Sequence, residues 1–118
     1  MHIEINRRTN AIIISFDTHR SSFDSASERN KFFRGLYGWE QSVPRNGKVY
    51  HYWRSGVLDD VPHVKISDSV FAIEKTNEGK IMEYFDEWED KIELEMFEVL
   101  MEFERLLNKA RTNDENRS

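Results

Sequence analysis

The sequence of 118 residues predicts a mixed α+β domain built on an antiparallel sheet. Three observations predict it: a short apolar run at residues 11–17, an Asn46-Gly47 dipeptide between two alternating segments, and two apolar stripes with helical spacing. The run at 11–17 is apolar on both faces, which is typical of a strand in the middle of a sheet. Asp17 ends this strand, so we expect its carboxylate at the surface.

A helix is expected after a short polar turn. Ser25 is followed three residues later by Glu28, which is the spacing of a capping box at a helix start. Gly38 supplies the residue that ends such a helix. The apolar side chains between them have the three- and four-residue spacing of one helical stripe, and they are Phe32, Phe33, Leu36 and Tyr37.

The segments 39–45 and 48–54 flank Asn46-Gly47, the dipeptide best suited to a tight hairpin. Pro44 has no backbone donor, so the first arm is expected at a sheet edge or near the turn. Alternation in the second arm predicts one core face, with Val49, His51 and Trp53, and one aromatic and cationic outer face, with Tyr50, Tyr52 and Arg54.

The second half of the chain predicts a connection, a strand and a helix. Residues 55–68 contain glycine, proline and aspartates that resist regular structure, so we expect a connection there. Residues 69–75 are expected to form a strand, and Thr76 or Asn77 can cap the next helix. The apolar stripe of that helix consists of Ile81, Tyr84, Phe85 and Trp88.

The C-terminal segment fits two periods. Residues 92–98 alternate as an amphipathic strand would, yet residues 92–106 also carry a helical stripe. We favour a strand at 92–98 and a helix through Arg111; the alternative keeps 78–111 as one or two long helices that dimerise. Residues 112–118 have nothing to bury and are expected to form a disordered polar tail. The sum is a single domain at 1–111 with a ferredoxin-like βαββαβ sheet, two helices on one face and an added C-terminal helix.

The amino-acid composition bears on three questions: cysteine-based sites, membrane spans and charged partners. There is no cysteine, which excludes disulfides and zinc-thiolate sites and favours a cytoplasmic location. The longest apolar segment, 11–14, is far too short to span a membrane, so no membrane partner is expected. The net charge of −5 divides unevenly: residues 1–58 hold nine Lys and Arg against five Asp and Glu, and residues 59–118 hold eight against seventeen. This division suggests a basic face for an anionic partner, or simply a solvated acidic helix.

Asp17 is the first candidate for chemistry. Asp17 and Asp24 could hold a divalent cation such as Mg²⁺, and His19 beside them could act as a general base. The alternatives are that Asp17 accepts hydrogen bonds from loop backbone and that His19 is an ordinary solvated histidine. The candidate catalytic residues are therefore Asp17 and His19, and the candidate metal ligands are Asp17 and Asp24.

A second group of residues suggests nucleic-acid binding. Exposed aromatic rings stack on bases, and neighbouring cations meet phosphates. The candidates on the hairpin are Lys48, Tyr50, Tyr52 and Arg54, and those that would steer phosphates elsewhere are Arg20, Arg29, Lys31 and Arg34. The alternative is that the aromatic rings pack under a helix or a partner subunit.

The first part of the chain resembles a known family. Residues 13–17 (Ile-Ile-Ser-Phe-Asp), the polar loop, the helix ending near Tyr37-Gly38-Trp39 and the strand after it resemble the small CRISPR-associated adaptation nucleases and the virulence-associated protein D toxins. The resemblance covers residues 1–50 and implies a ferredoxin-like homodimer in which Asp17 serves magnesium-dependent phosphodiester cleavage. The later hairpin and acidic segment depart from that family's plan.

Two functions follow as hypotheses. The first is a small nucleic-acid-binding domain, with a metal-dependent nuclease as its catalytic version. The alternative is a non-catalytic dimeric module that binds a protein through the aromatic hairpin or the acidic C-terminal helix.

Overall fold

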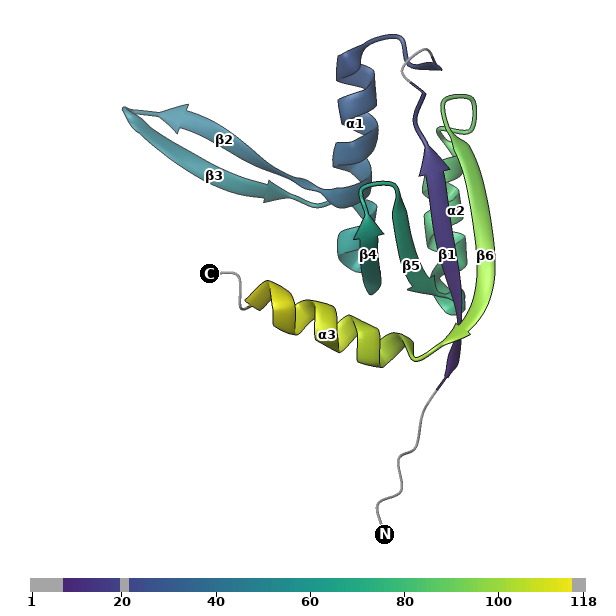
Figure 1. Cartoon of the computed structure of the whole chain (residues 1–118). Helices are drawn as coiled ribbons and strands as arrows, with labels where there is room; N and C mark the ends of the chain where they lie inside the picture. The colour runs from purple at the N-terminus through teal and green to yellow at the C-terminus, as the bar shows by residue number, and fades with distance from the viewer. Residues whose placement is uncertain (1–7, 20–21, 116–118) are drawn as a thin grey trace. The chain divides into compact units, whose positions relative to one another are not determined.

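The computed structural model describes residues 8–19 and 22–115. Contacts within the chain divide it into two compact units. Among the described residues, the first unit comprises 8–17, 62–79 and 94–115, and the second comprises 18–19, 22–61 and 80–93. Together the units hold three α-helices, a four-stranded sheet and a two-stranded sheet, so the predicted mixed α+β class is confirmed (Figure 1).

The first unit is an antiparallel sheet in the order β4-β5-β1-β6. Its strands are β1 (Thr9–Asp17), β4 (His63–Ser67), β5 (Val70–Glu74) and β6 (Glu93–Met101). β1 lies between β5 and β6, and Ile13 pairs with Ala72 of β5. The predicted position of the first apolar run in the middle of a sheet is therefore confirmed.

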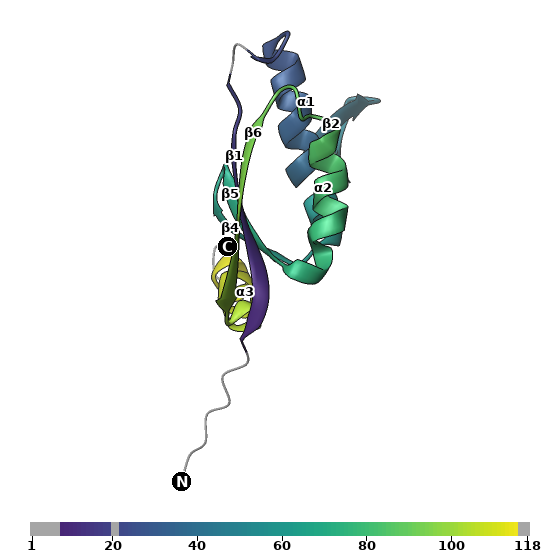
Figure 2. The same cartoon turned by 90° about the vertical axis from the view of Figure 1, so that its right-hand side faces the viewer.

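Helix α3 (Phe103–Glu115) packs on one face of this sheet (Figures 1 and 2). Phe103 is fully buried with Ala11 and Ala72, because small residues on β1 and β5 leave room for its ring. Five partly buried side chains surround this cluster: Ile13, Val64, Val99, Met101 and Leu107. The strand and helix favoured for the C-terminal segment are confirmed, and the long-helix alternative is wrong. The helix extends to Glu115, into the segment expected as a tail, whose last residues 116–118 lie outside the described part.

The second unit contains α1 (Ala26–Tyr37), most of α2 (Glu78–Asp86) and a hairpin of β2 (Trp39–Arg45) and β3 (Lys48–Arg54). A short 3-10 turn, Val57–Asp60, follows the hairpin, and another, Lys75–Asn77, precedes α2. Phe32 on α1 is the centre of an aromatic cluster, with ring centroids 6.0 Å from Phe85 and 5.4 Å from Trp88. The two predicted apolar stripes therefore meet each other in this core.

Capping residues explain where α1 begins and ends. The Oγ of Ser25 accepts a hydrogen bond from the backbone N–H of Glu28 at 3.1 Å, as the capping box predicts. The Glu28 carboxylate, however, accepts from the N–H of Asp24 at 3.0 Å, one residue before the expected partner. Gly38 ends the helix with a φ of +82° that a residue with a side chain rarely adopts.

The predicted ferredoxin-like arrangement is not confirmed, because the strands that make up the main sheet are not the ones expected. The hairpin forms a two-stranded sheet of its own instead of supplying strands to the main sheet. Its place is taken by β4, which lies inside the segment 55–68 that we expected to be a connection. Within the described residues, no helix is long and apolar enough to cross a membrane.

Candidate nucleic-acid interface

The hairpin presents an aromatic and cationic surface on one side. Asn46 and Gly47 take φ values of +51° and +77°, which is the backbone of a tight two-residue turn. This turn fixes the register, in which Gln41 lies opposite Tyr52. Side chains alternate along a strand, so every second residue shares a face. We call the resulting surface the stacking face: Trp39, Gln41, Val43 and Arg45 of β2 with Lys48, Tyr50, Tyr52 and Arg54 of β3.

The two tyrosines of the stacking face are open to solvent. Tyr50 is 44% exposed and Tyr52 is 39% exposed. Arg54 is held beside them, because its Nε donates a hydrogen bond to the Gln41 side chain at 2.6 Å and its Cζ lies 5.8 Å from the Tyr52 ring centroid. The face carries cations and aromatic rings and no carboxylate.

The carboxylates near the hairpin contact residues on its other face. There the Glu40 carboxylate lies 2.8 Å from Nδ1 of His51, and the indole N–H of Trp53 donates to Asp59 at 3.0 Å. All of β3 is exposed, so the prediction that Val49, His51 and Trp53 face the core is wrong. The second arm has no buried side, and the difference between its two faces is one of charge.

A pocket of about 310 Å³ lies at the base of the hairpin. Its lining consists of Ser27, Lys31, Arg34, Gly35, Trp39 and Ser55, and we call it the α1 pocket. Lys31 and Arg34 lie one turn apart on α1, so both cations point to the same side of the helix. The Arg34 guanidinium lies over the Trp39 ring, with Cζ 4.2 Å from its centroid.

Trp39 joins the two surfaces. It lines the α1 pocket, and it is also the residue of β2 that pairs with Arg54 at the end of the stacking face. A continuous strip of the second unit therefore combines cationic side chains with aromatic rings. Trp39 was missed in the sequence analysis, although counting outward from the Asn46-Gly47 turn places it opposite Arg54.

The other predicted cations lie elsewhere. Arg29 donates to the Thr18 hydroxyl at 3.1 Å, and its Cζ lies 4.9 Å from the Phe33 ring centroid. Its Nε is buried without a hydrogen-bond partner among the described residues. These contacts make Arg29 part of the packing around α1, and it does not line the α1 pocket. Arg20 lies outside the described residues.

The residues predicted for metal chemistry occupy three different environments. Asp17 is exposed at the end of β1, directly after the buried Phe16. His19 lies with its Nε2 3.4 Å from the carboxylate of Glu93. Asp24 lies 3.5 Å from the ammonium of Lys91.

Lys91 already supplies the positive charge beside Asp24. Its ammonium lies 3.3 Å from Glu28 as well, and the hydrogen bond with Glu28, together with the charge of Asp24, raises the pKa of Lys91 above its usual value. A Mg²⁺ ion at Asp24 would have to compete with this ammonium.

The described residues do not bring three candidate metal ligands together. Mg²⁺ requires several oxygen ligands in octahedral geometry. In the part of the chain that the structure describes, no three His, Asp or Glu side chains gather where an ion could bind. Of the two predicted ligands, Asp24 is paired with Lys91, and Asp17 is exposed at the end of β1.

Comparisons of the chain with protein-family models, with curated proteins and with solved structures find no match. The resemblance to the adaptation nucleases and virulence-associated protein D toxins stays a prediction.

Proposed function

We propose that this chain binds single-stranded nucleic acid along the stacking face and the α1 pocket. The observation that carries the proposal is Trp39, which connects Lys31 and Arg34 on α1 with Tyr52 and Arg54 on the hairpin. Stacking needs bases that are not already paired, so the surface suits a single strand better than a duplex. The cations then neutralise phosphates between the stacked bases.

Fluorescence anisotropy with a labelled single-stranded oligonucleotide, as DNA and as RNA, tests the stacking step. Loss of one stacked base costs about 1–3 kcal/mol, so Tyr52→Ala should raise Kd by about five- to 150-fold. Tyr52→Phe keeps the ring and should bind like the unmodified chain. Val49→Ala removes an exposed side chain from the opposite face of the same strand, so it is the matched control.

The salt dependence of the same binding reaction tests the cations. Each phosphate contact in a single strand contributes about 0.7 to the slope of log K against log salt. Arg34→Ala should therefore weaken binding and flatten this slope by about that amount. An affinity that is independent of salt, or equal losses for Tyr52→Ala and Val49→Ala, would contradict the proposal.

A ferredoxin-like topology with the hairpin as an insertion is the part of the proposal that concerns the fold. With the hairpin set aside, the sheet strands in chain order are β1, β4, β5 and β6, and α1 and α2 follow the first and third of them. Their order across the sheet, second-third-first-fourth, supports this assignment.

Metal-dependent cleavage is a second proposal, supported by the exposed carboxylate of Asp17 at the end of a buried strand. Mg²⁺ in phosphoryl-transfer sites is held by one or two carboxylates together with substrate phosphates, so Asp17 could contribute once nucleic acid is bound. We expect cleavage of labelled RNA or DNA to require added magnesium and to be lost in Asp17→Asn. Asp60→Asn, another exposed aspartate, is the control. Cleavage indifferent to both magnesium and Asp17→Asn would refute this role.

A further inference from the structure

The two edge strands of the main sheet differ. β4 is five residues long and has an irregular register between Lys65 and Ser67, which are features that discourage pairing with another chain. β6 is nine residues long, and no described strand pairs with its outer edge. It also exposes large apolar side chains, since Phe97 is 51% and Leu100 67% exposed. β6 is therefore the edge that is suited to accept another strand.

We propose that β6 pairs antiparallel with β6 of a second copy of this chain, so that two four-stranded sheets continue into one. The proposal concerns the first unit and does not rest on the nucleic-acid-binding function. Full-length pairing of a strand with its own copy places the central residue opposite itself, and the centre of Glu93–Met101 is Phe97. In the same register Leu94 lies opposite Leu100 of the copy, which buries an apolar pair on each side of the two-fold axis.

The charges of β6 fit this register. Its three glutamates, Glu93, Glu95 and Glu98, would each lie opposite an apolar residue of the copy: Met101, Val99 and Met96. A shift of one residue toward the N-terminus would place Glu95 opposite Glu98 twice, and like charges directly opposite destabilise a sheet. The pattern is thus self-complementary, which is why we infer a second copy and not an unrelated partner.

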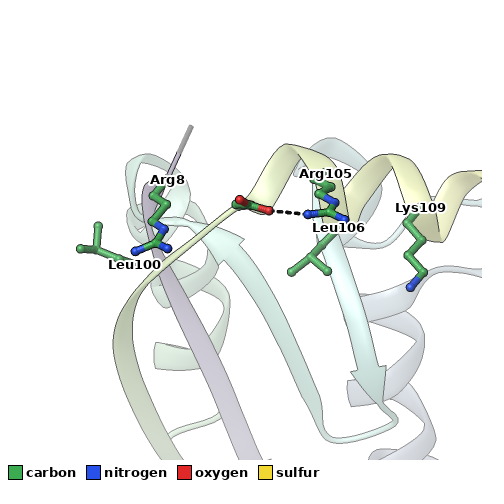
Figure 3. Close-up of a pocket in the computed structure, with 6 residues that line it drawn as sticks. Arg8, Leu100, Arg105, Leu106 and Lys109 are labelled. Carbon is green, nitrogen blue, oxygen red and sulfur yellow. Dashed lines mark hydrogen bonds and ion pairs between the residues drawn. The ribbon is translucent and has the colours of Figure 1, made fainter. Parts of the chain in front are cut away.

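The surface at the C-terminal end of β6 adds charge complementarity. A pocket of about 490 Å³ there is lined by Arg8, Leu100, Glu102, Arg105, Leu106 and Lys109 (Figure 3). The lining holds three cations, Arg8, Arg105 and Lys109, and one carboxylate, Glu102. Arg105 donates a hydrogen bond to Glu102 at 3.0 Å. Antiparallel pairing brings the acidic N-terminal half of the copy's β6 alongside this basic end.

The arrangement has a consequence for Asp17. β1 and β6 are antiparallel neighbours, and β6 is antiparallel to its copy, so the two β1 strands also run in opposite directions. Asp17 ends β1, and the two copies of Asp17 would lie at opposite ends of the joined sheet. This dimer therefore does not bring two Asp17 carboxylates to one metal ion.

Disulfide trapping tests the register, because the chain has no cysteine of its own. Directly opposite residues in an antiparallel pair have Cα atoms about 4.5–5.5 Å apart, a separation that a disulfide can bridge. Phe97→Cys should give a covalent dimer on oxidation, seen on a non-reducing gel. Ile66→Cys, at an equally exposed apolar position on β4, is the matched control and should stay monomeric. Equal cross-linking of the two variants, or none of Phe97→Cys, overturns the proposal.

Sedimentation velocity over a concentration series tests the dimer without a cross-link. We expect the unmodified chain to dimerise and Phe97→Lys, which sets two ammonium groups opposite each other, to raise the dimer Kd about tenfold or more. Ile66→Lys should behave like the unmodified chain. An unmodified chain that stays monomeric, or Ile66→Lys that dissociates as Phe97→Lys does, overturns the proposal.

Discussion

Tyr84 shows how one polar atom is accommodated in the aromatic core of the second unit. Its hydroxyl donates to the backbone carbonyl of Phe32 at 2.6 Å, and its ring stacks on the Phe32 ring with centroids 5.8 Å apart. A Cβ added at Gly35 would collide with the same hydroxyl, so any larger residue there would have to displace the Tyr84 side chain. Burial, with a smaller contribution from the charge of Glu87, raises the pKa of Tyr84 above its ordinary value of 10.0.

We predict that Tyr84→Phe lowers the free energy of unfolding by about 0.5–1.5 kcal/mol near neutral pH, because the hydrogen bond from the Tyr84 hydroxyl to the Phe32 carbonyl is lost. The raised pKa keeps Tyr84 neutral in the folded chain, so its stabilisation is complete below pH 10.0 and falls above it, where the unfolded chain ionises first. Urea unfolding on both sides of that pH should therefore show a steeper alkaline loss for the unmodified chain than for Tyr84→Phe. Parallel pH profiles would contradict the assignment, and Tyr50→Phe on the exposed hairpin is the control.

Single residues with local effects were the most predictable part of this chain. Ser25, Gly38 and the Asn46-Gly47 turn act through their own backbone or that of near neighbours, and the structure confirms each position. Lys31 and Arg34 were also predicted, because their charge and helical spacing are visible in the sequence. Trp39 completes the pocket that Lys31 and Arg34 line. Its position there is set by the direction in which the hairpin leaves α1, and no local sequence pattern predicts that direction.

At the scale of elements, alternation predicted the hairpin but not its surroundings. A strand of alternating residues is typical of a half-buried position, yet burial requires another layer, and β3 is exposed along its whole length. β4 was missed for the opposite reason. Gly56, Asp59, Asp60 and Pro62 correctly indicate a turn region, and they obscured the short alternation of Val64 and Ile66 that follows.

The strand β6 shows where sequence periodicity alone cannot decide. Its residues fit a helical stripe as well as a strand, and the helix propensities of glutamate, leucine and methionine favour a helix. The position beside β1 decides in favour of the strand, because the backbone groups of β1 find hydrogen-bond partners there. A pairing partner far away in the sequence thus overrides local propensity.

At the scale of the whole molecule, the two proposed surfaces belong to different compact units. Tyr52 and the α1 pocket lie in the second unit, and Phe97 lies in the first. The two surfaces also differ in physical type, since one is proposed to bind phosphates through cations and the other to pair through its backbone and apolar side chains. Oligonucleotide binding and self-association should therefore respond to different substitutions and to different solution conditions.

We predict that the two activities separate in a pair of variants. Phe97→Lys should weaken self-association while an oligonucleotide short enough to cover one hairpin binds each chain with unchanged Kd, because no base contact is lost. Tyr52→Ala should do the reverse, weakening oligonucleotide binding and leaving the dimer intact. Sedimentation velocity and anisotropy on the same preparations measure both, and raising the salt concentration should weaken oligonucleotide binding far more than the dimer. If either variant loses both activities while its unfolding curve is unchanged, then the two surfaces act as one coupled site and do not function independently.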